Sequence, residues 1–348
     1  MITYCSITMV SLCENFTNSG GYSQLTSLWI DAFIMDVITG IGIIGNTLIC
    51  VILMQKNMRR NTFNQLRVAL AFFDIFLLTT MFVTFALLRS AKDILQAVHP
   101  SLLWPFMSIF ITISVFMTVV IAWERHGAIN NPYSYQSYQE YQAMKCVSSI
   151  IVVAFILNIG KFFEIQPTQC VERPGFMGVL TLMPILKNKI YAIYNMVILW
   201  ILIGGIIPVT LLICLYTKIF IKIHEHKVTM ASLNVTVKKR MMREVRMAIT
   251  FAGVVITLII CTLPGWLFWF EVLVDEGKAK NMEYYETVSI VRMVFYMLNS
   301  SMNIFIYTCL DTTFREEMKK LFKHLFRKNV NLRNQGNAPI SMECETAC

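Results

Sequence analysis

The sequence is poor in charged side chains. They make up 15% of its 348 residues, whereas soluble globular proteins carry about 25%. Hydrophobic residues make up 56% of the chain, and they stand in long runs. A run of about 18 apolar residues or more can cross the hydrocarbon core of a bilayer as a helix. Because lipid cannot satisfy backbone hydrogen bonds, such runs predict a helical membrane bundle and argue against a soluble fold.

Other absences narrow the function further. No two of the ten cysteines have the CxxC spacing of a zinc or redox site, and the N-terminus lacks the basic segment of a cleavable signal peptide. No nucleophile stands in a plausible register with a base or a set of metal ligands, so we do not predict an enzyme. The formal charge is +9, but the basic residues lie between the apolar runs and form no single stripe. No nucleic-acid partner is therefore predicted.

Each of seven apolar runs predicts a membrane-spanning helix, so the predicted fold class is an all-α, seven-helix bundle. The runs are Leu28–Met54, Val68–Leu88, Leu102–Trp123, Met144–Phe163, Ile190–Ile221, Met247–Phe270 and Val288–Cys309. Four regions follow from these boundaries and from the tail described below. They are an N-terminal segment 1–27, a seven-helix domain 28–310, an interfacial helix 311–328 and a disordered tail 329–348.

The charges between the runs predict the orientation of the chain. The first basic residue is Lys56, directly after the first run, and the connection that follows also holds Arg59, Arg60 and Arg67. Basic residues then concentrate in the odd-numbered connections and behind the seventh run. Because basic loops face the cytoplasm, we expect a multi-pass plasma-membrane protein with an extracellular N-terminus and a cytoplasmic C-terminus. The sequon at Asn15 lies on the outer side and is the predicted glycosylation site.

The segment behind the seventh run is amphipathic. Apolar residues of Phe314–Lys328 fall on one helical face and basic residues on the opposite face. This pattern is typical of a helix that lies in the cytoplasmic membrane interface, with lipid as its partner. The polar stretch from Asn329 onward has the composition of a disordered tail.

Polar residues interrupt several runs, and an ionisable group inside lipid is a functional suspect. Asp74 lies in the second run, and short polar side chains lie in others, namely Asn46, Ser114, Asn299, Ser300 and Asn303. One carboxylate with several such groups is what a small hard cation needs. The same residues equally suit a hydrogen-bond network around a protonated Asp74. At the end of the third run, Glu124 and Arg125 taken by charge alone indicate a membrane-edge salt bridge.

Six short motifs, in order and spacing, resemble the class A (rhodopsin-like) G-protein-coupled receptors. They are GN at Gly45-Asn46, LAFFD at Leu70–Asp74, ERHGAINNP at Glu124–Pro132, Pro208 with Tyr216, CTLP at Cys261–Pro264, and NSSMNIFIY at Asn299–Tyr307 before Phe314. Each motif is weak alone, and their joint register over all seven runs carries the resemblance. The stretches NIGKFFE (Asn158–Glu164) and LNSSMNIFIY (Leu298–Tyr307) are similar to the FMRFamide-type peptide receptors of invertebrates.

The resemblance implies roles for individual residues. Arg125 would be restrained by Glu124 in the inactive receptor and would meet a heterotrimeric G-protein on activation. Tyr216 and Tyr307 would swing toward Arg125, and arrestin is implied as a further partner. The family's sodium-binding positions fall on Asp74, Ser114, Asn299 and Asn303, with Asn46 as their packing partner. The resemblance therefore favours the cation interpretation and implies an allosteric sodium ion, with no other cofactor.

The sequence also departs from the family's pattern. Thr262 stands where most members carry the tryptophan of CWxP, and Ile304 replaces the proline of NPxxY, so the seventh helix must kink by other means, through Asn303 and the flanking serines. The third run begins after Pro100 without a cysteine, so the family's usual disulfide cannot form. Cys170 in the second outer loop is left with Cys5 or Cys13, and Cys13–Cys170 is our preferred pair.

The same comparison bears on the ligand. Met107 stands where amine receptors carry an aspartate, and Met297 where opsins carry the retinal lysine, which argues against both ligands. An amphipathic peptide would suit the long outer loop 165–189 and the aromatic residues Trp266, Phe268, Trp269, Tyr284 and Tyr285. An arginine of an RFamide-type peptide needs a carboxylate and gains from aromatic stacking. The candidate acids are Glu164, Glu172, Glu271, Glu283 and Glu286, with Glu271 and Glu286 best placed. The alternative, that the acids only solvate the rim, applies to most of them.

The predicted function is a G-protein-coupled receptor for an extracellular ligand, with an amidated, FMRFamide-like neuropeptide as the first candidate. An orphan or chemosensory class A receptor for a small molecule is the alternative, which the departures at Thr262, Ile304 and Pro100 favour. A transporter or channel is a distant alternative. Such proteins tend to show internal repeats and mid-membrane charges, whereas we find no repeat and Asp74 is the only clear mid-membrane carboxylate.

Overall fold

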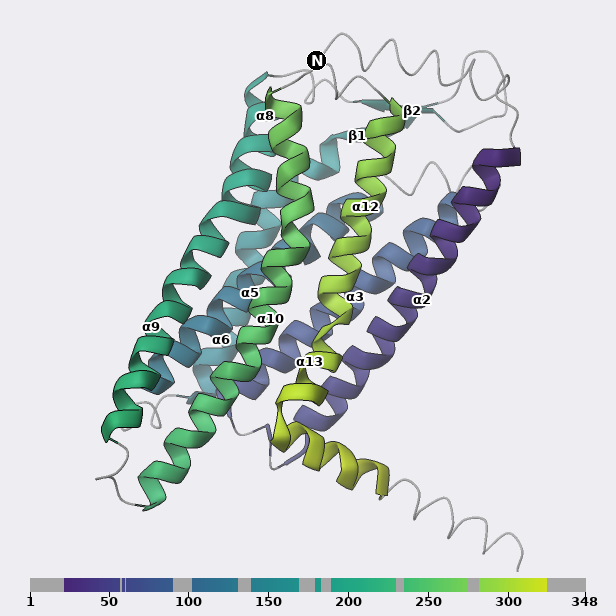
Figure 1. The fold of residues 1–348 in the computed structure, drawn as a ribbon. Helices are drawn as coiled ribbons and strands as arrows, with labels where there is room; N and C mark the ends of the chain where they lie inside the picture. The colour runs from purple at the N-terminus through teal and green to yellow at the C-terminus, as the bar shows by residue number, and fades with distance from the viewer. Residues whose placement is uncertain are drawn as a thin grey trace, which may run out of the picture.

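In the computed structural model, long helices run side by side in one elongated bundle (Figure 1). The structure describes residues 22–56, 58–59, 61–89, 102–130, 139–168, 179–182, 189–229, 235–274 and 282–323. Within these ranges seven helical segments are long and apolar enough to span a membrane, namely Phe33–Leu53, Thr62–Thr84, Trp104–Asn130, Ala143–Phe163, Val197–Glu225, Met241–Leu267 and Ile290–Leu310. The prediction of a seven-helix bundle is confirmed.

The helices extend beyond the apolar runs that predicted them. Their bounds are α2 (Tyr22–Leu53), α3 (Thr62–Arg89), α5 (Trp104–Asn130), α6 (Gln139–Asn158) with the 3₁₀ turn η3 (Ile159–Phe163), α8 (Lys189–Ile193), η4 (Tyr194–Ile206), α9 (Ile207–Thr229), α10 (Val235–Val274), α12 (Met282–Ser301) and α13 (Asn303–Leu310). The third run ends at Trp123, for example, whereas α5 continues to Asn130. Backbone hydrogen bonds continue a helix through polar residues, so apolar length gives only the part inside lipid.

A short hairpin joins the fourth and fifth spans, and the prediction of helices alone did not include it. Strands β1 (Ile165–Thr168) and β2 (Val179–Leu182) pair antiparallel, with Ile165 opposite Leu182 and Thr168 opposite Val179. In Figure 1 the hairpin lies at the end of the bundle where α2 and α8 begin, which we call the hairpin end. The opposite end, where the chain leaves α13, is called the tail end.

Two of the spans contain irregular turns. The seventh is interrupted at Met302, between α12 and α13, which agrees with a kink at Asn303 and the serines. The fifth begins with the π-helical turns of η4, where the N–H of Ile207 donates to the carbonyl of Leu202. Pro208 follows directly, and a proline has no N–H and clashes with the preceding turn of an α-helix. A wider i→i+5 turn removes that conflict, and such turns recur at functional sites.

The core differs between the two ends of the bundle. Helix α5 contacts α3, α6, α9 and α10, so it lies at the centre. Toward the tail end the buried residues are mostly branched and aromatic, among them Ile52, Phe63, Ile121, Leu215 and Phe251. Toward the hairpin end a smaller cluster is rich in methionine, with Met35, Met81, Met107 and Met297. Because methionine is flexible and polarizable, the hairpin half can repack around a bound group more easily.

The chain turns at Asp311 and residues 312–323 are again helical. The carboxylate of Asp311 caps this helix by accepting the N–H of Phe314 at 3.0 Å. Phe314 is fully buried and packs against Tyr307, with ring centroids 5.9 Å apart. This helix lies within the predicted interfacial segment 311–328, whose last residues fall outside the described ranges.

Candidate functional site

Asp74 is the centre of a buried polar network halfway along the bundle. It lies on α3, is fully buried, and accepts a hydrogen bond from Ser114 of α5 at 3.1 Å. The Ser300 hydroxyl of α12 donates to the same oxygen at 2.9 Å, and Asn303 of α13 donates to the other oxygen at 2.8 Å. The carboxylate therefore joins three spans at the point where the seventh helix is interrupted.

The network differs from the predicted set at one position. Asn299 is half-buried, and the hydrogen bond from the end of α12 to Asp74 comes from its neighbour Ser300. Asn46 lies beside the network and donates to the backbone carbonyl of Ser300 at 2.9 Å. Within the described residues, no group of three or more His, Cys, Asp or Glu side chains is placed to hold a metal ion. Any cation here would therefore depend on one carboxylate and neutral oxygens.

Arg125 forms an ion-pair cluster near the tail end. Its Nε and Nη2 donate to Glu124, the next residue back on α5. Its Nη1 donates to Glu244 of α10 at 2.6 Å, and the guanidinium stacks on the Phe63 ring at 4.0 Å. Arg125 is 1% exposed. The arginine thus ties α5 to α10, and Glu244 is a partner that the sequence analysis did not name, although it stands as an acid within a basic stretch.

The two predicted activation tyrosines are buried in the same half of the bundle. Tyr216 of α9 and Tyr307 of α13 belong to the main hydrophobic cluster. The Tyr216 hydroxyl has no hydrogen-bond partner in the described part of the chain, whereas the Tyr307 ring lies against the Arg67 guanidinium. A buried hydroxyl without a partner is costly, so Tyr216 gains free energy if a rearrangement brings an acceptor to it.

A second buried ion pair lies beside Tyr307. Arg67, which the sequence placed among the basic residues of a loop, lies inside α3 and is 1% exposed. Its guanidinium donates to Asp311 at 3.1 Å and stacks over the Tyr307 ring at 3.8 Å. The prediction that Arg67 lies in the first loop was wrong, because α3 begins at Thr62. The pair connects α3 to the turn before residues 312–323.

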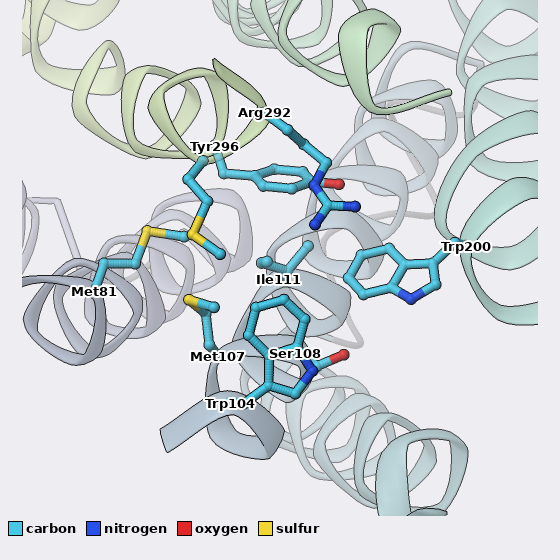
Figure 2. Close-up of a pocket in the computed structure, with 9 residues that line it drawn as sticks. Met81, Trp104, Met107, Ser108, Ile111, Trp200, Arg292 and Tyr296 are labelled. Carbon is cyan, nitrogen blue, oxygen red and sulfur yellow. The ribbon is translucent and has the colours of Figure 1, made fainter. Parts of the chain in front are cut away.

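A cavity lies between the spans toward the hairpin end (Figure 2). Its lining residues are Met81, Trp104, Met107, Ser108, Ile111, Trp200, Arg292, Met293 and Tyr296. The free space is about 10 Å³, which is room for roughly one water molecule. None of the predicted ligand-binding residues is among the nine. The sequence analysis did not name Arg292. It could have done so, because Arg292 is an ionisable residue inside the seventh run, and the same feature in the second run identified Asp74.

A buried polar cluster adjoins the cavity. Lys161 of η3 donates to Asn195 and lies 3.0 Å from the carboxylate of Glu164. Tyr191 donates to the same carboxylate at 2.8 Å, and Asn195 donates at 3.0 Å. Burial and the Glu164 carboxylate raise the pKa of the Tyr191 phenol, so it remains a donor. Glu164, a candidate for binding a ligand's arginine, is therefore already engaged within the fold.

The other predicted ligand residues lie on the helices near the hairpin end. Trp266 of α10 is half-buried and packs against Gly205 of η4, whose missing side chain leaves room for the indole. Glu271 is half-buried near the end of α10. Trp269 of α10 and Tyr284, Tyr285 and Glu286 of α12 have described backbones, but their side chains lie outside the description. Cys13, Cys170 and Asn15 also lie outside the described residues.

Comparison with known proteins agrees with this arrangement. The sequence matches the family described as 7 transmembrane receptor (rhodopsin family) over residues 45–307. The neuropeptide Y receptor type 1 of Xenopus laevis is 23% identical over 295 residues, which are 81% of this chain and 77% of that receptor. The FMRFamide receptor of Drosophila melanogaster is 23% identical over 346 residues, 93% of this chain and 58% of that receptor. The FMRFamide peptide receptor frpr-18 of Caenorhabditis elegans is 31% identical over 136 residues, 37% of this chain and 32% of that receptor.

The family match runs from the first span to the end of the seventh. The chain therefore belongs to the rhodopsin family of seven-transmembrane, G-protein-coupled receptors. It is a receptor and not an enzyme, and it is a multi-pass protein of the plasma membrane.

Proposed function

We propose that this receptor recognises an extracellular peptide at the hairpin end and signals to a heterotrimeric G-protein at the tail end. The observation that carries the proposal is the cluster of Arg125 with Glu124 and Glu244, which holds α5 and α10 together at the end opposite the cavity. A peptide ligand is supported by the relatives, which are named as neuropeptide Y and FMRFamide receptors. An amidated, FMRFamide-like peptide is the first candidate.

The orientation is part of the proposal. The hairpin end and the N-terminal segment lie outside the cell, and the tail end with residues 312–323 lies in the cytoplasm. Basic residues support this assignment, because Arg243, Arg246 and Lys320 lie at the tail end and cytoplasmic segments carry an excess of lysine and arginine. The same orientation makes Asn15 available for glycosylation and Cys13 and Cys170 available for pairing on the outer side.

Activation is a shift between two arrangements of the bundle. A ligand at the hairpin end favours the arrangement in which the tail end of α10 moves outward. Arg125 then leaves Glu244 and becomes available to the G-protein, and the hydroxyls of Tyr216 and Tyr307 move toward it. A cleft of about 200 Å³, lined by Arg246 and Met247 among others, already lies beside this helix. It is the place that an outward movement of α10 would enlarge, and arrestin would use the same surface.

The network at Asp74 is the proposed site of an allosteric sodium ion. Oxygen atoms of Asp74, Ser114 and Ser300 converge there, and oxygen is the ligand that hard cations prefer. The ion would supply positive charge to the buried carboxylate. Asn46 and Asn303 hold the segments around it, and the hydrogen bonds of Asp74 to Ser300 and Asn303 keep the two halves of the seventh helix in their inactive arrangement.

The outer ends of α10 and α12 are the proposed mouth for the peptide. Glu271 and Glu286 remain the candidate acids for a peptide arginine, while Glu164 acts through Lys161 and Tyr191 within the fold. The residues proposed to line the mouth are Trp266, Trp269, Tyr284 and Tyr285. At the tail end, residues 312–323 contact lipid through exposed apolar side chains such as Phe322.

Cell-based signalling assays test the proposal. Calcium and cAMP responses are measured in transfected cells against a library of amidated peptides that includes FMRFamide. We expect a concentration-dependent response that Arg125→Ala removes while surface expression remains. We expect Lys319→Gln, which removes an exposed lysine of residues 312–323, to respond normally. Receptor at the cell surface that responds to no peptide would contradict the peptide assignment, and a response to small organic ligands would establish the chemosensory alternative.

A further inference from the structure

The cleft at the tail end lies between α10 and the turn that follows α13. Its lining residues are Met242, Arg243, Arg246, Met247, Asp311 and Thr313. The free space is about 200 Å³, whereas one water molecule needs roughly 10–15 Å³ of such space. The cleft can therefore hold a group much larger than a water molecule, unlike the cavity toward the hairpin end.

The walls of this cleft carry a net positive charge. Arg243 is exposed, and Arg246 donates to the neutral hydroxyl of Thr312 at 2.8 Å. Neither arginine forms an ion pair within the part of the chain that the structure describes. Asp311 is the one acid in the lining, but its Oδ2 pairs with Arg67 at 3.1 Å and its Oδ1 caps the following helix. The cleft therefore favours an anionic group.

The lipid-facing side of α10 borders the cleft. Residues three and four positions apart are neighbours on a helix surface, and Met242 and Ile249 flank Arg246 in this way. Both are exposed, and the same face continues along the span with the exposed Ile256 and Ile260. In a membrane bundle, exposed apolar side chains of this kind contact the acyl chains of lipids. Arg246 thus lies where the lipid-facing surface of α10 meets the cleft.

Both arginines lie near the end of the apolar span. The span of α10 is Met241–Leu267, so Arg243 and Arg246 lie two and five residues inside its tail end. An α-helix rises about 1.5 Å per residue, which places both within roughly 8 Å of that end. Arginine side chains near a helix end extend to the interface while their stems stay in apolar surroundings. Lipid headgroups, with their phosphates, lie at the same depth.

We propose that this cleft binds the headgroup of an anionic membrane lipid that carries a phosphomonoester, with Arg243 and Arg246 as its donors. A phosphomonoester bears a charge of about −1.5 to −2 at pH 7 and three acceptor oxygens. This charge matches two guanidinium groups, each of which can bind phosphate in a bidentate arrangement. The acyl chains would lie along the exposed face of α10. The inference rests on the proposed orientation, because anionic inositol lipids belong to the cytoplasmic leaflet.

Binding to the purified full-length receptor tests the site. The receptor is immobilised in detergent, and surface plasmon resonance measures its affinity for dioctanoyl phosphatidylinositol bisphosphate. We expect saturable binding, with dioctanoyl phosphatidylinositol and phosphatidylserine at least roughly tenfold weaker, since both lack the phosphomonoester. The double variant Arg243→Gln, Arg246→Gln should bind the bisphosphate roughly tenfold more weakly or worse. The matched control Lys319→Gln, Lys323→Gln removes the same charge from exposed lysines of residues 312–323 and should keep nearly all of the affinity.

Three outcomes would overturn the proposal. Equal affinity for the three lipids would show that the phosphomonoester is not recognised, and equal losses in the two double variants would show attraction by charge without a site. Soluble inositol trisphosphate that binds as tightly as the lipid would assign the cleft to a free phosphate compound. The lipid comparison uses the wild type, so poor folding of a variant cannot hide the result. Because neither agonist nor G-protein takes part, a failure here refutes the lipid site alone, whereas the absence of all peptide responses would refute the proposed function.

Discussion

Asp74 shows how one ionisable side chain, whose burial in the membrane costs free energy, requires hydrogen-bond donors from the helices around it. A carboxylate buried in lipid costs several kcal/mol unless hydrogen bonds or a counter-charge compensate it. Both of its oxygens accept hydrogen bonds, from Ser114, Ser300 and Asn303. The donors come from separate helical segments, so the free energy of satisfying one side chain depends on how α3, α5 and the seventh span are arranged. The hydrogen bonds of Asp74 are therefore sensitive to any movement of these helices relative to one another.

The sodium proposal makes a prediction at this scale. Coupling between two sites is about 1–3 kcal/mol in typical allosteric proteins, so sodium is expected to lower agonist affinity roughly fivefold or more. Asp74→Asn should remove this dependence, because the carboxylate is lost while the shape is kept. Ser300→Ala should weaken it, and Asn299→Ala should leave it unchanged. The measurement is agonist affinity from competition binding, in buffer that contains sodium and in a matched buffer that contains a large organic cation. Sodium sensitivity that persists in Asp74→Asn would rule out the site.

Arg67 is a charged side chain buried in the core, and its contacts explain how the fold accommodates it. Its ion pair with Asp311 and its stacking on Tyr307 lie in the core, and the pair joins residues far apart in the chain. Breaking one partner of such a pair leaves a buried charge, which typically costs about 3–5 kcal/mol. If Tyr307 swings toward Arg125 on activation, its ring must leave the Arg67 guanidinium. The stacking of Tyr307 on Arg67 is therefore a contact that the proposed activation movement would have to break.

At the scale of helices, Arg125 contacts α10 through the Glu244 carboxylate, and this contact makes a second prediction. Glu244 is 2.6 Å from the arginine and its side chain is 18% exposed. A hydrogen bond between charged groups of this kind contributes about 1.5–3 kcal/mol, so Glu244→Gln should raise the active population, and with it basal signalling, roughly tenfold. The control is Glu225→Gln, which breaks the exposed pair with Lys222 on α9. Basal cAMP or calcium signalling at matched surface expression is the measurement, and an unchanged basal level would show that the contact does not restrain α10.

The contact of α2 with α13 explains how the seventh span tolerates the loss of its usual proline. Ile304 takes that position, and a side chain added at Gly45 of α2 would lie 2.6 Å from its Cγ2 atom. The glycine lets the two backbones approach while the larger isoleucine fills the space between them. The interruption at Met302 remains, next to the Ser300 and Asn303 contacts with Asp74. In this chain, contacts with α2 and α3 accompany the interruption of the seventh span at the place where the family carries a proline.

At the scale of the whole molecule, the orientation is testable directly. Epitope tags are added to the N-terminus and, in a second version, to the C-terminus. In intact transfected cells only the N-terminal tag should bind antibody, because basic segments at the tail end keep that end in the cytoplasm. The C-terminal tag should bind only after the membrane is permeabilised, which serves as the control for expression. Staining of the C-terminal tag in intact cells would reverse the assignment of both ends.

The sequence alone predicted the number of membrane spans, the family, and functional roles for Asp74 and Arg125. These features are local, because the length of an apolar run and the cost of a charge inside it do not depend on which segments become neighbours. Arg292 carried the same local signal and could have been found by the same argument. The interruption near Asn303 could also be expected, since polar side chains cluster there in an otherwise apolar run.

Tertiary structure decided which groups meet. Ser300 donates to Asp74, whereas Asn299 is half-buried, because the packing of α12 against α3 decides which face of the helix meets Asp74. Glu244 reaches Arg125, and Asp311 reaches Arg67, across 119 and 244 residues of chain. The β-hairpin and the cavity toward the hairpin end also depend on how distant segments pack. A charge pattern shows that a buried group needs a partner, whereas only the packed bundle, by bringing helices within hydrogen-bond distance, selects the partner.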